Sequence, residues 1–367
     1  MRQVSLSQRR TAELDASIPS DAAAEVLVVI PCLNEEGHVE GVVESLLKGA
    51  DDIRMNIVVA DGGSTDGTRA IIARLADRDS RIILLDNPNK IQSVAINEAV
   101  RRYGEDARIL IRVDAHAEYP EGYCVQLIAV QAKTGADSVV VPMRTSGRSC
   151  FQRAAAAAQN SILGNGGASH RNTTSGRWVD HGHHALMTLA AFRAVGGYDE
   201  SFSHNEDAEF DVRFREAGYR IFLTGENPII YFPRRTAVAL FRQYFNIGRG
   251  RARNFLKHRS STRVRHLVLA VVAPAICLLV LAPLAPVLAF PAIAWSLVCL
   301  GYGLVLGLRL RDACAAASGV AAMATQAGWS FGFLVELAAR ALRVGVAAMG
   351  ISARRHAASR GQGRDVS

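Results

Sequence analysis

The stretch Glu25-Val-Leu-Val-Val-Ile30, followed directly by Pro31-Cys-Leu-Asn-Glu-Glu-Gly37, decides the fold that we predict for this chain. Its first part is a short, continuous apolar run rich in β-branched residues, which is typical of a strand buried on both faces. Proline, asparagine and glycine then end the strand. Apolar residues follow at helical spacing, at Val39, Val42, Val43, Leu46 and Leu47. The stretch therefore predicts a buried strand, a turn and an amphipathic helix.

The same alternation recurs further along the chain. Strands are expected at 57–60, 81–85 and 109–113, and helices at 70–75 and 93–102. Apolar strands that alternate with helices indicate a parallel sheet covered by helices on both faces. The predicted fold class is therefore α/β, Rossmann-like, with a mostly parallel sheet. Ligands of such sheets bind at the carboxyl ends of the strands.

The C-terminal part of the chain is much more apolar than the rest. From Leu267 to Leu308 there are 42 residues without a single Asp, Glu, Lys or Arg. Because roughly 20 apolar residues cross a bilayer core, this stretch is long enough to cross twice. We therefore predict a disordered leader (1–24), a soluble α/β domain (25–233), a basic membrane-proximal segment (234–265), two transmembrane helices (266–308), and an interfacial or re-entrant helix with a basic tail (309–367).

The net charge of +8 is concentrated in one place. Ten Lys and Arg residues and no acid lie between Arg234 and Arg265, so the rest of the chain has a net charge of −2. A basic strip beside an apolar run is typical of the cytoplasmic side of a membrane, where it contacts anionic lipid headgroups. Nucleic-acid-binding arms are also basic, but a charge confined to this strip argues against a nucleic-acid partner. We expect a protein of the inner (cytoplasmic) membrane with its soluble domain in the cytoplasm.

The six cysteines show no metal-type spacing, and three of them lie in or beside apolar segments. They predict reduced, structural thiols rather than a disulfide framework. The polar N-terminus also lacks the apolar core that a signal peptide needs. Both observations agree with a cytoplasmic soluble domain.

Polar residues collect directly after three of the predicted strands. Asn34 and Glu35 follow the first strand, Asp61-Gly-Gly-Ser-Thr-Asp-Gly-Thr68 follows the second, and Asp114-Ala-His116 follows the strand at 109–113. Each element alone is also a common turn or helix cap. Because the strand ends share one edge of the sheet, we expect the three elements to converge. Carboxylates and an imidazole can hold a divalent cation, which would offset the charge of a nucleoside diphosphate.

Four motifs in order resemble the signatures of family-two glycosyltransferases, which have the GT-A fold. They are Val29-Ile-Pro-Cys-Leu-Asn-Glu-Glu36, Val59-Ala-Asp-Gly-Gly-Ser-Thr-Asp-Gly-Thr68, Arg112-Val-Asp-Ala-His116 and Asn205-Glu-Asp207, the last followed by Phe210, Arg213 and Gly218-Tyr219. Within the family, the resemblance is to the membrane-bound glucosyltransferases of succinoglycan assembly. It is carried by Val113-Asp-Ala-His116, Val179-Asp-His-Gly-His-His184 and Gly248-Arg-Gly-Arg251.

The resemblance implies roles on the side of the sugar donor. Residues Pro31 to Glu35, with Asp61, would hold the nucleobase and ribose. Asp114 would bind the donor diphosphate and a divalent metal, Mg²⁺ or Mn²⁺. His116 stands where many relatives carry the second aspartate of an Asp-x-Asp motif, and as a metal ligand its imidazole would suit Mn²⁺ better than Mg²⁺.

On the acceptor side, the resemblance implies that Asp207 is the general base. Displacement by a sugar hydroxyl needs a base within hydrogen-bond reach, but a carboxylate at a helix start can equally be a cap. Glu206 is adjacent, and either carboxylate could be the base, with Glu206 otherwise a contact to the acceptor. Asp180 and His183 are expected to contact the acceptor, and ordinary loop residues are the alternative.

Three cations are candidates for contacts with phosphate. Lys90 follows the turn Asn87-Pro-Asn89 and could reach the nucleotide or remain a solvated lysine. Arg249 and Arg251 could contact the diphosphate of the donor or of a lipid-linked acceptor, because guanidinium pairs well with phosphate oxygens. Contact with the membrane surface alone is the other interpretation. Asn246 and Ile247 stand where processive synthases of the family carry Arg and Trp, which argues against a processive enzyme.

Together these features predict an inverting, metal-dependent glycosyltransferase. It would move a single hexose, glucose from UDP-glucose, from its nucleotide-sugar donor to a polyprenyl-diphosphate-linked saccharide during exopolysaccharide assembly. Membrane lipids would be further partners, and nucleic acid would not. The alternatives are a synthase that charges polyprenyl phosphate with one sugar, and an inactive membrane scaffold that binds nucleotide. The presence of both Asp114 and Asp207 argues against the scaffold.

Overall fold

The computed structural model describes residues 26–165, 175–226, 228–258 and 264–361. The chain divides into two compact units. The first comprises residues 1–144, 169–201 and 213–231, and the second comprises residues 145–168, 202–212 and 232–367. The predicted leader, residues 1–24, lies outside the described residues.

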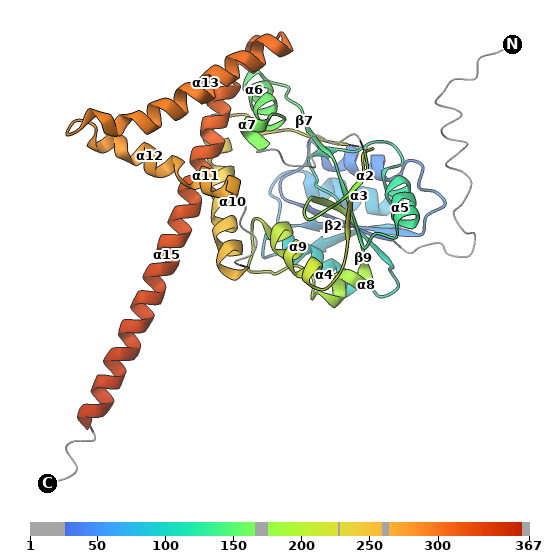
Figure 1. Cartoon of the computed structure of the whole chain (residues 1–367). Coiled ribbons are helices and arrows are strands. Elements are labelled where there is room, and N and C mark those ends of the chain that lie inside the picture. Colours follow the sequence, from blue (N-terminus) through green and yellow to red (C-terminus); the bar gives the residue numbers. More distant parts are fainter. Residues whose placement is uncertain (1–25, 166–174, 227, 259–263, 362–367) are drawn as a thin grey trace. The chain divides into compact units, whose positions relative to one another are not determined.

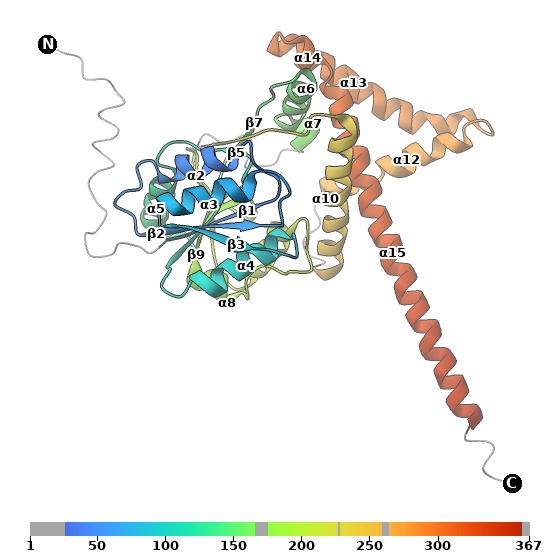
Figure 2. The same ribbon diagram turned by 180° about the vertical axis from the view of Figure 1, so that it is seen from behind.

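The first unit is built on an eight-stranded sheet with the order β3-β2-β1-β4-β9-β6-β10-β8 (Figures 1 and 2). Its strands are β1 (Val26–Cys32), β2 (Met55–Asp61), β3 (Ile82–Asp86), β4 (Ile109–Arg112), β6 (Ser138–Val141), β8 (Arg177–Val179), β9 (His183–Thr188) and β10 (Ile221–Leu223). The first four run parallel, as do β6 and β10, whereas β9 and β8 are antiparallel to their neighbours. The predicted α/β fold with a mostly parallel sheet is confirmed. A second sheet has the order β5-β11-β7, with strands Ala117–Glu118, Ile229–Tyr231 and Met143–Thr145.

Helices cover both faces of the large sheet, as the apolar strands predict. The helices of this unit are α2 (Val39–Leu47), α3 (Thr68–Arg78), α4 (Gln92–Tyr103), α5 (Tyr123–Thr134) and α8 (Leu189–Ala194). Val26, Val28 and Ile30 of β1 share one core with α2, α3 and α5. Leu27 and Val29 are buried as well, and α4 packs on the same strand. Because successive side chains of a strand point to opposite faces, α4 lies on the other face, together with α8 (Figures 1 and 2).

The second unit is helical. Its helices are α6 (Cys150–Gln159), α7 (Ile162–Asn165), α10 (Ala237–Lys257), α11 (Val264–Ala270), α12 (Val272–Leu278), α13 (Phe290–Leu310), α14 (Ala313–Ala316) and α15 (Ser318–Gly361), with 3-10 turns at Leu279–Leu281 and Pro286–Ala289. Helix α9 (Glu206–Glu216) begins in this unit and ends in the first. Helix α15, with 44 residues, occupies most of the segment 309–367, for which the sequence predicted an interfacial or re-entrant helix with a basic tail.

Glycines set the distance between α10 and α15. A methyl group on Gly248 of α10 would lie 2.1 Å from the carbonyl oxygen of Trp329. On α15, a methyl group on Gly332 would lie 1.9 Å from the carbonyl oxygen of Phe245. Carbon atoms cannot approach carbonyl oxygens so closely, and small residues are what allow two helix backbones to pack at this range. The first glycine of the Gly248-Arg-Gly-Arg251 segment therefore serves helix packing.

The first of the two predicted membrane spans is not one continuous helix. Pro274 has no N–H to donate to the carbonyl oxygen of Ala270, so the helix breaks between α11 and α12. Ser330 of α15 closes this break, because its hydroxyl donates to Ala270 O at 3.1 Å and accepts from Ala273 N at 2.9 Å. Of the described helices, one, Pro286–Leu310, is long and apolar enough to cross a membrane, and His266–Leu281 is apolar but shorter. Two crossings stay a prediction.

One expectation about the cysteines is wrong. Cys150 of α6 and Cys314 of α14 form a disulfide although they are 164 residues apart in the sequence. The packing of α6 on α14 brings them together, and Arg153 and Asp312 form an ion pair of 2.7 Å between the same segments. Linear spacing carries no sign of such a pairing, which is why the sequence predicted six reduced thiols.

Candidate active site

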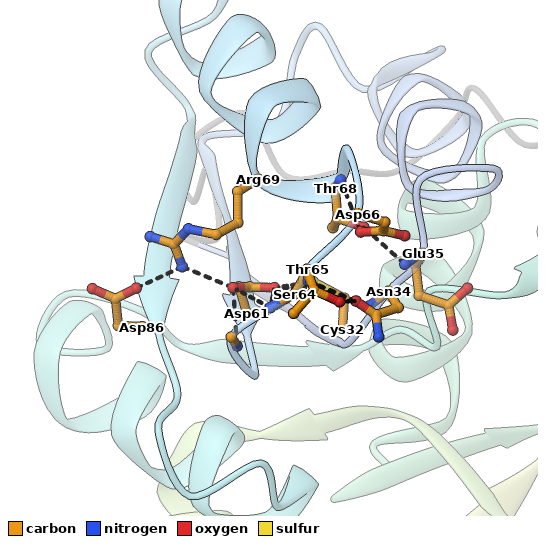
Figure 3. A network of polar contacts seen from close by, with 11 residues as sticks. Cys32, Asn34, Glu35, Asp61, Ser64, Thr65, Asp66, Thr68, Arg69 and Asp86 are labelled. Atoms are coloured by element: carbon orange, nitrogen blue, oxygen red, sulfur yellow. Dashed lines mark hydrogen bonds and ion pairs between the residues drawn. The ribbon is translucent and has the colours of Figure 1, made fainter.

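The loops after β1 and β2 are joined by hydrogen bonds between side chains and backbone (Figure 3). Asn34, in the left-handed region with φ 56°, accepts from the backbone N–H of Thr65 at 2.8 Å. Its own N–H donates to the hydroxyl of Ser64 at 2.8 Å, and the N–H of Glu35 donates to the hydroxyl of Thr68 at 2.8 Å. Asparagine is among the few residues that adopt this backbone conformation readily. The prediction that the two strand ends converge is confirmed.

Asp61 holds the loop after β2 through hydrogen bonds to its backbone. Its buried carboxylate accepts from the backbone N–H groups of Gly63 at 3.0 Å and Ser64 at 3.1 Å, and from Arg69 at 2.7 Å. Burial raises the pKa of Asp61, but the hydrogen bonds from Ser64 and Arg69 outweigh burial, so the net pKa lies below its ordinary value of 3.8. The exposed side chain of Lys90 passes this loop, since a methyl group on Gly63 would lie 3.9 Å from its Cε.

Asp114 lies at the centre of a polar cluster just beyond β4. Its Oδ2 is 3.4 Å from Nε2 of His183, its Oδ1 accepts from the side-chain amide of Gln92 at 3.3 Å, and Arg112 lies 4.0 Å away. Burial raises the pKa of Asp114, but the charges of His183 and Arg112 outweigh burial and hold the pKa well below its usual range. The carboxylate is therefore ionised and carries a full negative charge.

Tyr119 and Gln92 are functional candidates that the sequence analysis missed. The hydroxyl of Tyr119 accepts from the backbone N–H of Asp114 at 2.7 Å and donates to its carbonyl oxygen at 3.2 Å, which fixes the backbone of Asp114. No sequence pattern indicates this role. Gln92, in contrast, is the first residue of α4, directly after the loop that follows β3. Its position directly after a fourth strand end is the sequence signal that points to it.

His183 belongs to the cluster around Asp114, and its expected contact with the acceptor stays a prediction. It is the first residue of β9, which pairs antiparallel with β4 and so brings the imidazole to Asp114. Asp180, the other expected acceptor contact, is mostly exposed and lies 4.0 Å from Arg215. Pro31 lies in β1 and pairs with Ala60 of β2, next to the joined loops.

His116 contacts the loop after β1. Its Nδ1 lies 3.1 Å from one carboxylate oxygen of Glu35, whose other oxygen lies 3.1 Å from Nδ1 of His38. Burial raises the pKa of Glu35, but His116 and His38 together outweigh burial, so the net pKa lies below 4.5. Across the described part of the chain, no three His, Cys, Asp or Glu side chains are grouped so that they could hold a metal ion. Asp114 and His116 could therefore coordinate a cation only if a bound ligand supplied the remaining coordinating atoms.

In the second unit, Asp207 lies half-buried in the first turn of α9. Asn205 precedes this helix with φ 63°, and its side-chain amide donates to the carbonyl oxygen of Ile247 in α10 at 2.6 Å. A methyl group on Gly250 of α10 would lie 2.2 Å from the carbonyl oxygen of His204. The backbone that leads into Asp207 therefore rests directly on α10.

The arginines that follow these glycines differ in their surroundings. Arg249 and Arg253 of α10 form ion pairs of 3.0 and 2.8 Å with Glu336 of α15, whose side chain is 2% exposed. Arg251 instead lines a cavity of the second unit. Glu206, the neighbour of Asp207, is buried. The buried carboxylate of Glu336, which pairs with Arg249 and Arg253, fixes the orientation of this face of α10.

A mostly parallel sheet with joined loops after β1 and β2 and an ionised aspartate after β4 is the arrangement of a GT-A glycosyltransferase domain. Residues 27–196 match the description of Glycosyl transferase family 2. The chain is 51% identical over 311 residues to succinoglycan biosynthesis protein ExoA of Rhizobium meliloti (strain 1021), which covers 85% of this chain and 94% of that protein. The chain therefore belongs to glycosyl transferase family 2, and it is a glycosyltransferase.

The fold is also similar to that of a solved structure, the mannosyltransferase PcManGT from Pyrobaculum calidifontis in complex with GDP-Man and Mn²⁺. The TM-score is 0.54 at 19% sequence identity, over 88% of this chain and 94% of that protein. At this identity the similarity concerns the fold alone, and it agrees with the GT-A assignment.

Proposed function

We propose that the protein transfers a single hexose, glucose from UDP-glucose, to a polyprenyl-diphosphate-linked saccharide in the assembly of a succinoglycan-type exopolysaccharide, with inversion at the anomeric carbon. The relative at 51% identity is named for succinoglycan biosynthesis, which supports the pathway. The geometry around Asp114 beyond β4 is the observation that carries the donor chemistry, because Gln92 and His183 contact its carboxylate and Tyr119 fixes its backbone. Membrane association is part of the proposal, because a polyprenyl-linked acceptor does not leave the bilayer.

On the donor side, Asp114 and His116 would hold a divalent cation together with the diphosphate of the donor. The bound cation would supply positive charge that stabilises the leaving diphosphate. Tyr119 and Gln92 hold Asp114 in one orientation, so little reorganisation is needed when the donor binds. The joined loops that contain Asn34 would receive the nucleoside.

On the acceptor side, Asp207 would accept the proton of the acceptor hydroxyl. As this proton moves to the carboxylate, the hydroxyl oxygen forms a bond to the anomeric carbon, and the bond from that carbon to the diphosphate oxygen breaks. The electron pair leaves with the nucleoside diphosphate. A single displacement of this kind inverts the anomeric configuration.

The test is a transfer assay with the purified full-length protein in lipid nanodiscs. A panel of nucleotide sugars, with and without Mn²⁺, is offered with a diphosphate-linked saccharide lipid or with polyprenyl phosphate, and the anomeric configuration of the product is read by NMR. Asp207→Asn should lower kcat by about 10²- to 10⁴-fold, whereas Glu206→Gln should have a much smaller effect. Transfer to polyprenyl phosphate alone would establish the synthase alternative. Nucleotide binding without any transfer would establish the scaffold.

A further inference from the structure

The helices of the second unit surround a cavity of about 950 Å³ that the chemistry proposed above does not use. Segments from α7, α10, α11, α12, α13 and α15 line it, and most of the lining side chains are apolar or aromatic. They include Leu163, Ile247, Leu269, Leu278, Trp295 and Trp329. The volume is that of a cavity that can hold a sizeable organic ligand.

Two polar side chains in the wall, Trp295 and Gln326, are hydrogen-bonded to each other. Trp295 donates from its indole N–H to the side-chain oxygen of Gln326 at 2.7 Å, and the amide of Gln326 donates to the carbonyl oxygen of Leu163 at 2.9 Å. These groups have partners without any ligand, so a polar guest would lose its hydration and gain little. The interior of the cavity therefore favours an apolar guest.

Arg251 lines the cavity from α10 and adds a guanidinium group to its wall. A guanidinium beside an apolar chamber suits an anionic group attached to an apolar chain, because two of its N–H groups can donate to one phosphate. The charge of the lining thus complements a lipid phosphate or diphosphate.

The helices beside the cavity expose large apolar side chains. Val280 is 80% exposed, Leu284 84% and Val287 73%, all in the segment between α12 and α13. Exposed apolar side chains of this kind belong against lipid or a partner, and Val287 lies within the helix Pro286–Leu310, which is long enough to span a membrane. A ligand that is itself a membrane lipid would therefore be available close to the cavity.

We propose that this cavity binds the isoprenoid chain of the lipid-linked acceptor and that Arg251 contacts its diphosphate. The proposal rests on the function proposed above, which supplies a polyprenyl diphosphate rather than a phospholipid as the guest. It assigns Arg251 to the acceptor and leaves the donor diphosphate to the residues of the first unit.

The first test measures binding without sugar transfer. Full-length protein in nanodiscs is photolabelled with a benzophenone-bearing polyprenyl diphosphate that has no saccharide, with no nucleotide sugar present. Unlabelled polyprenyl diphosphate should compete, and phosphatidylglycerol should not. Ala275→Trp, which fills the cavity from α12, should weaken labelling at least tenfold. Its control, Leu297→Trp, places the same ring on a residue of α13 that is 65% exposed and outside the cavity, and should label like the wild type.

The second test concerns the charge. Arg251→Ala should weaken competition by polyprenyl diphosphate about tenfold and leave competition by uncharged polyprenol unchanged. Arg242→Ala, an exposed residue of the same helix outside this cavity, should change neither. Thermal unfolding of each variant verifies folding, and Ala275→Leu replaces Ala275→Trp if the latter does not fold.

The outcomes separate this inference from the proposed function. Equal competition by phosphatidylglycerol, or equal labelling of Ala275→Trp and Leu297→Trp, would overturn the inference even if sugar transfer proceeds. Labelling that Ala275→Trp and Arg251→Ala weaken, in an enzyme that never glycosylates a diphosphate-linked saccharide, would support the cavity assignment while the proposed function fails.

Discussion

The two units of this protein hold their functional backbone segments by different means. In the first unit, polar side chains tie one loop to the next, as when Asn34 accepts from Thr65 and the hydroxyl of Thr68 accepts from Glu35. In the second unit, α10 also forms ion pairs and hydrogen bonds, but it meets its neighbours through glycines as well, and at Gly250 and Gly332 there is no room for a methyl group. Close backbone packing at glycine is therefore what sets the second region apart.

This difference has consequences for function. The strength of charges and hydrogen bonds changes with pH, and it can be changed by a substitution that keeps the size of the side chain. Backbone contacts at glycine change with neither of these. The first unit should therefore be sensitive to the loss of a charge at constant size. The second should lose activity or stability when a methyl group is added at a glycine without any change in charge. The following experiments test this contrast, from the largest expected effect to the smallest.

Asp114→Asn should have the largest effect. The substitution keeps the shape and removes the charge that faces His183 and would face the donor diphosphate. We expect kcat/KM to fall by about 10²- to 10³-fold, with little change in thermal unfolding. Asp77→Asn, on the exposed side of α3, is the matched control and should retain activity. Near-normal transfer by Asp114→Asn would remove Asp114 from the donor site.

Gly250→Ala should have the next largest effect. The new methyl group would meet the carbonyl oxygen of His204 and displace the backbone that leads into Asp207. A displacement of about 1 Å at a catalytic group can cost 10²-fold in rate, and we expect a loss of that order in kcat. Gly41→Ala, where no atom lies within 4 Å of the added carbon, serves as the control. An unchanged kcat would mean that α10 does not position the start of α9.

Gly332→Ala tests volume in a place remote from the chemistry. Its methyl group would lie 1.9 Å from the carbonyl oxygen of Phe245, so α15 must move away from α10. Overpacking of this kind typically costs about 1–3 kcal/mol in the free energy of unfolding, which a thermal unfolding assay in detergent would detect. Gly301→Ala in α13, with open space around it, should instead leave stability unchanged or slightly raised. Equal melting temperatures for both variants would contradict the packing argument.

Acid should weaken the first unit through Asp61. Its folded pKa lies below 3.8, so its contribution to stability is present above that pH and is lost as the pH falls through the folded pKa. The free energy of unfolding of the wild type should therefore decrease more steeply below pH 4 than that of Asp61→Asn. Urea unfolding between pH 7 and pH 3 measures both slopes. Parallel slopes would show that Asp61 has the same pKa in the folded and unfolded states.

Local periodicity accounts for what the sequence predicted well. The strands and helices of residues 26–112 follow from apolar patterns that each occupy a few residues, and parallel pairing then brings Asn34, Asp61 and Asp114 to one edge. The structure confirms both steps. Apolar patterns specify burial directly, which is why this part of the fold could be predicted.

The rest depends on pairings between distant segments. His183 joins Asp114 only because β9 inserts antiparallel between β4 and β6, and no local pattern specifies that neighbour. Cys150 and Cys314 meet through helix packing in the same way. Tyr119 acts by holding a backbone group, a role that any residue with a hydroxyl in reach could fill. The functional roles of all the predicted site residues, Asp114 and Asp207 included, stay predictions.

Ser330 has a consequence for the order in which the chain can be completed. Because Pro274 has no N–H, the carbonyl oxygen of Ala270 accepts a hydrogen bond from the hydroxyl of Ser330 instead. The same hydroxyl accepts from the N–H of Ala273, which lies 57 residues before Ser330 in the sequence. During synthesis, α11 and α12 therefore leave the ribosome before Ser330 has been added. Until then these two backbone groups lack the hydrogen-bond partner that Ser330 provides. A nascent chain that stops before residue 330 should leave this pair open to proteases, and one that extends past it should close.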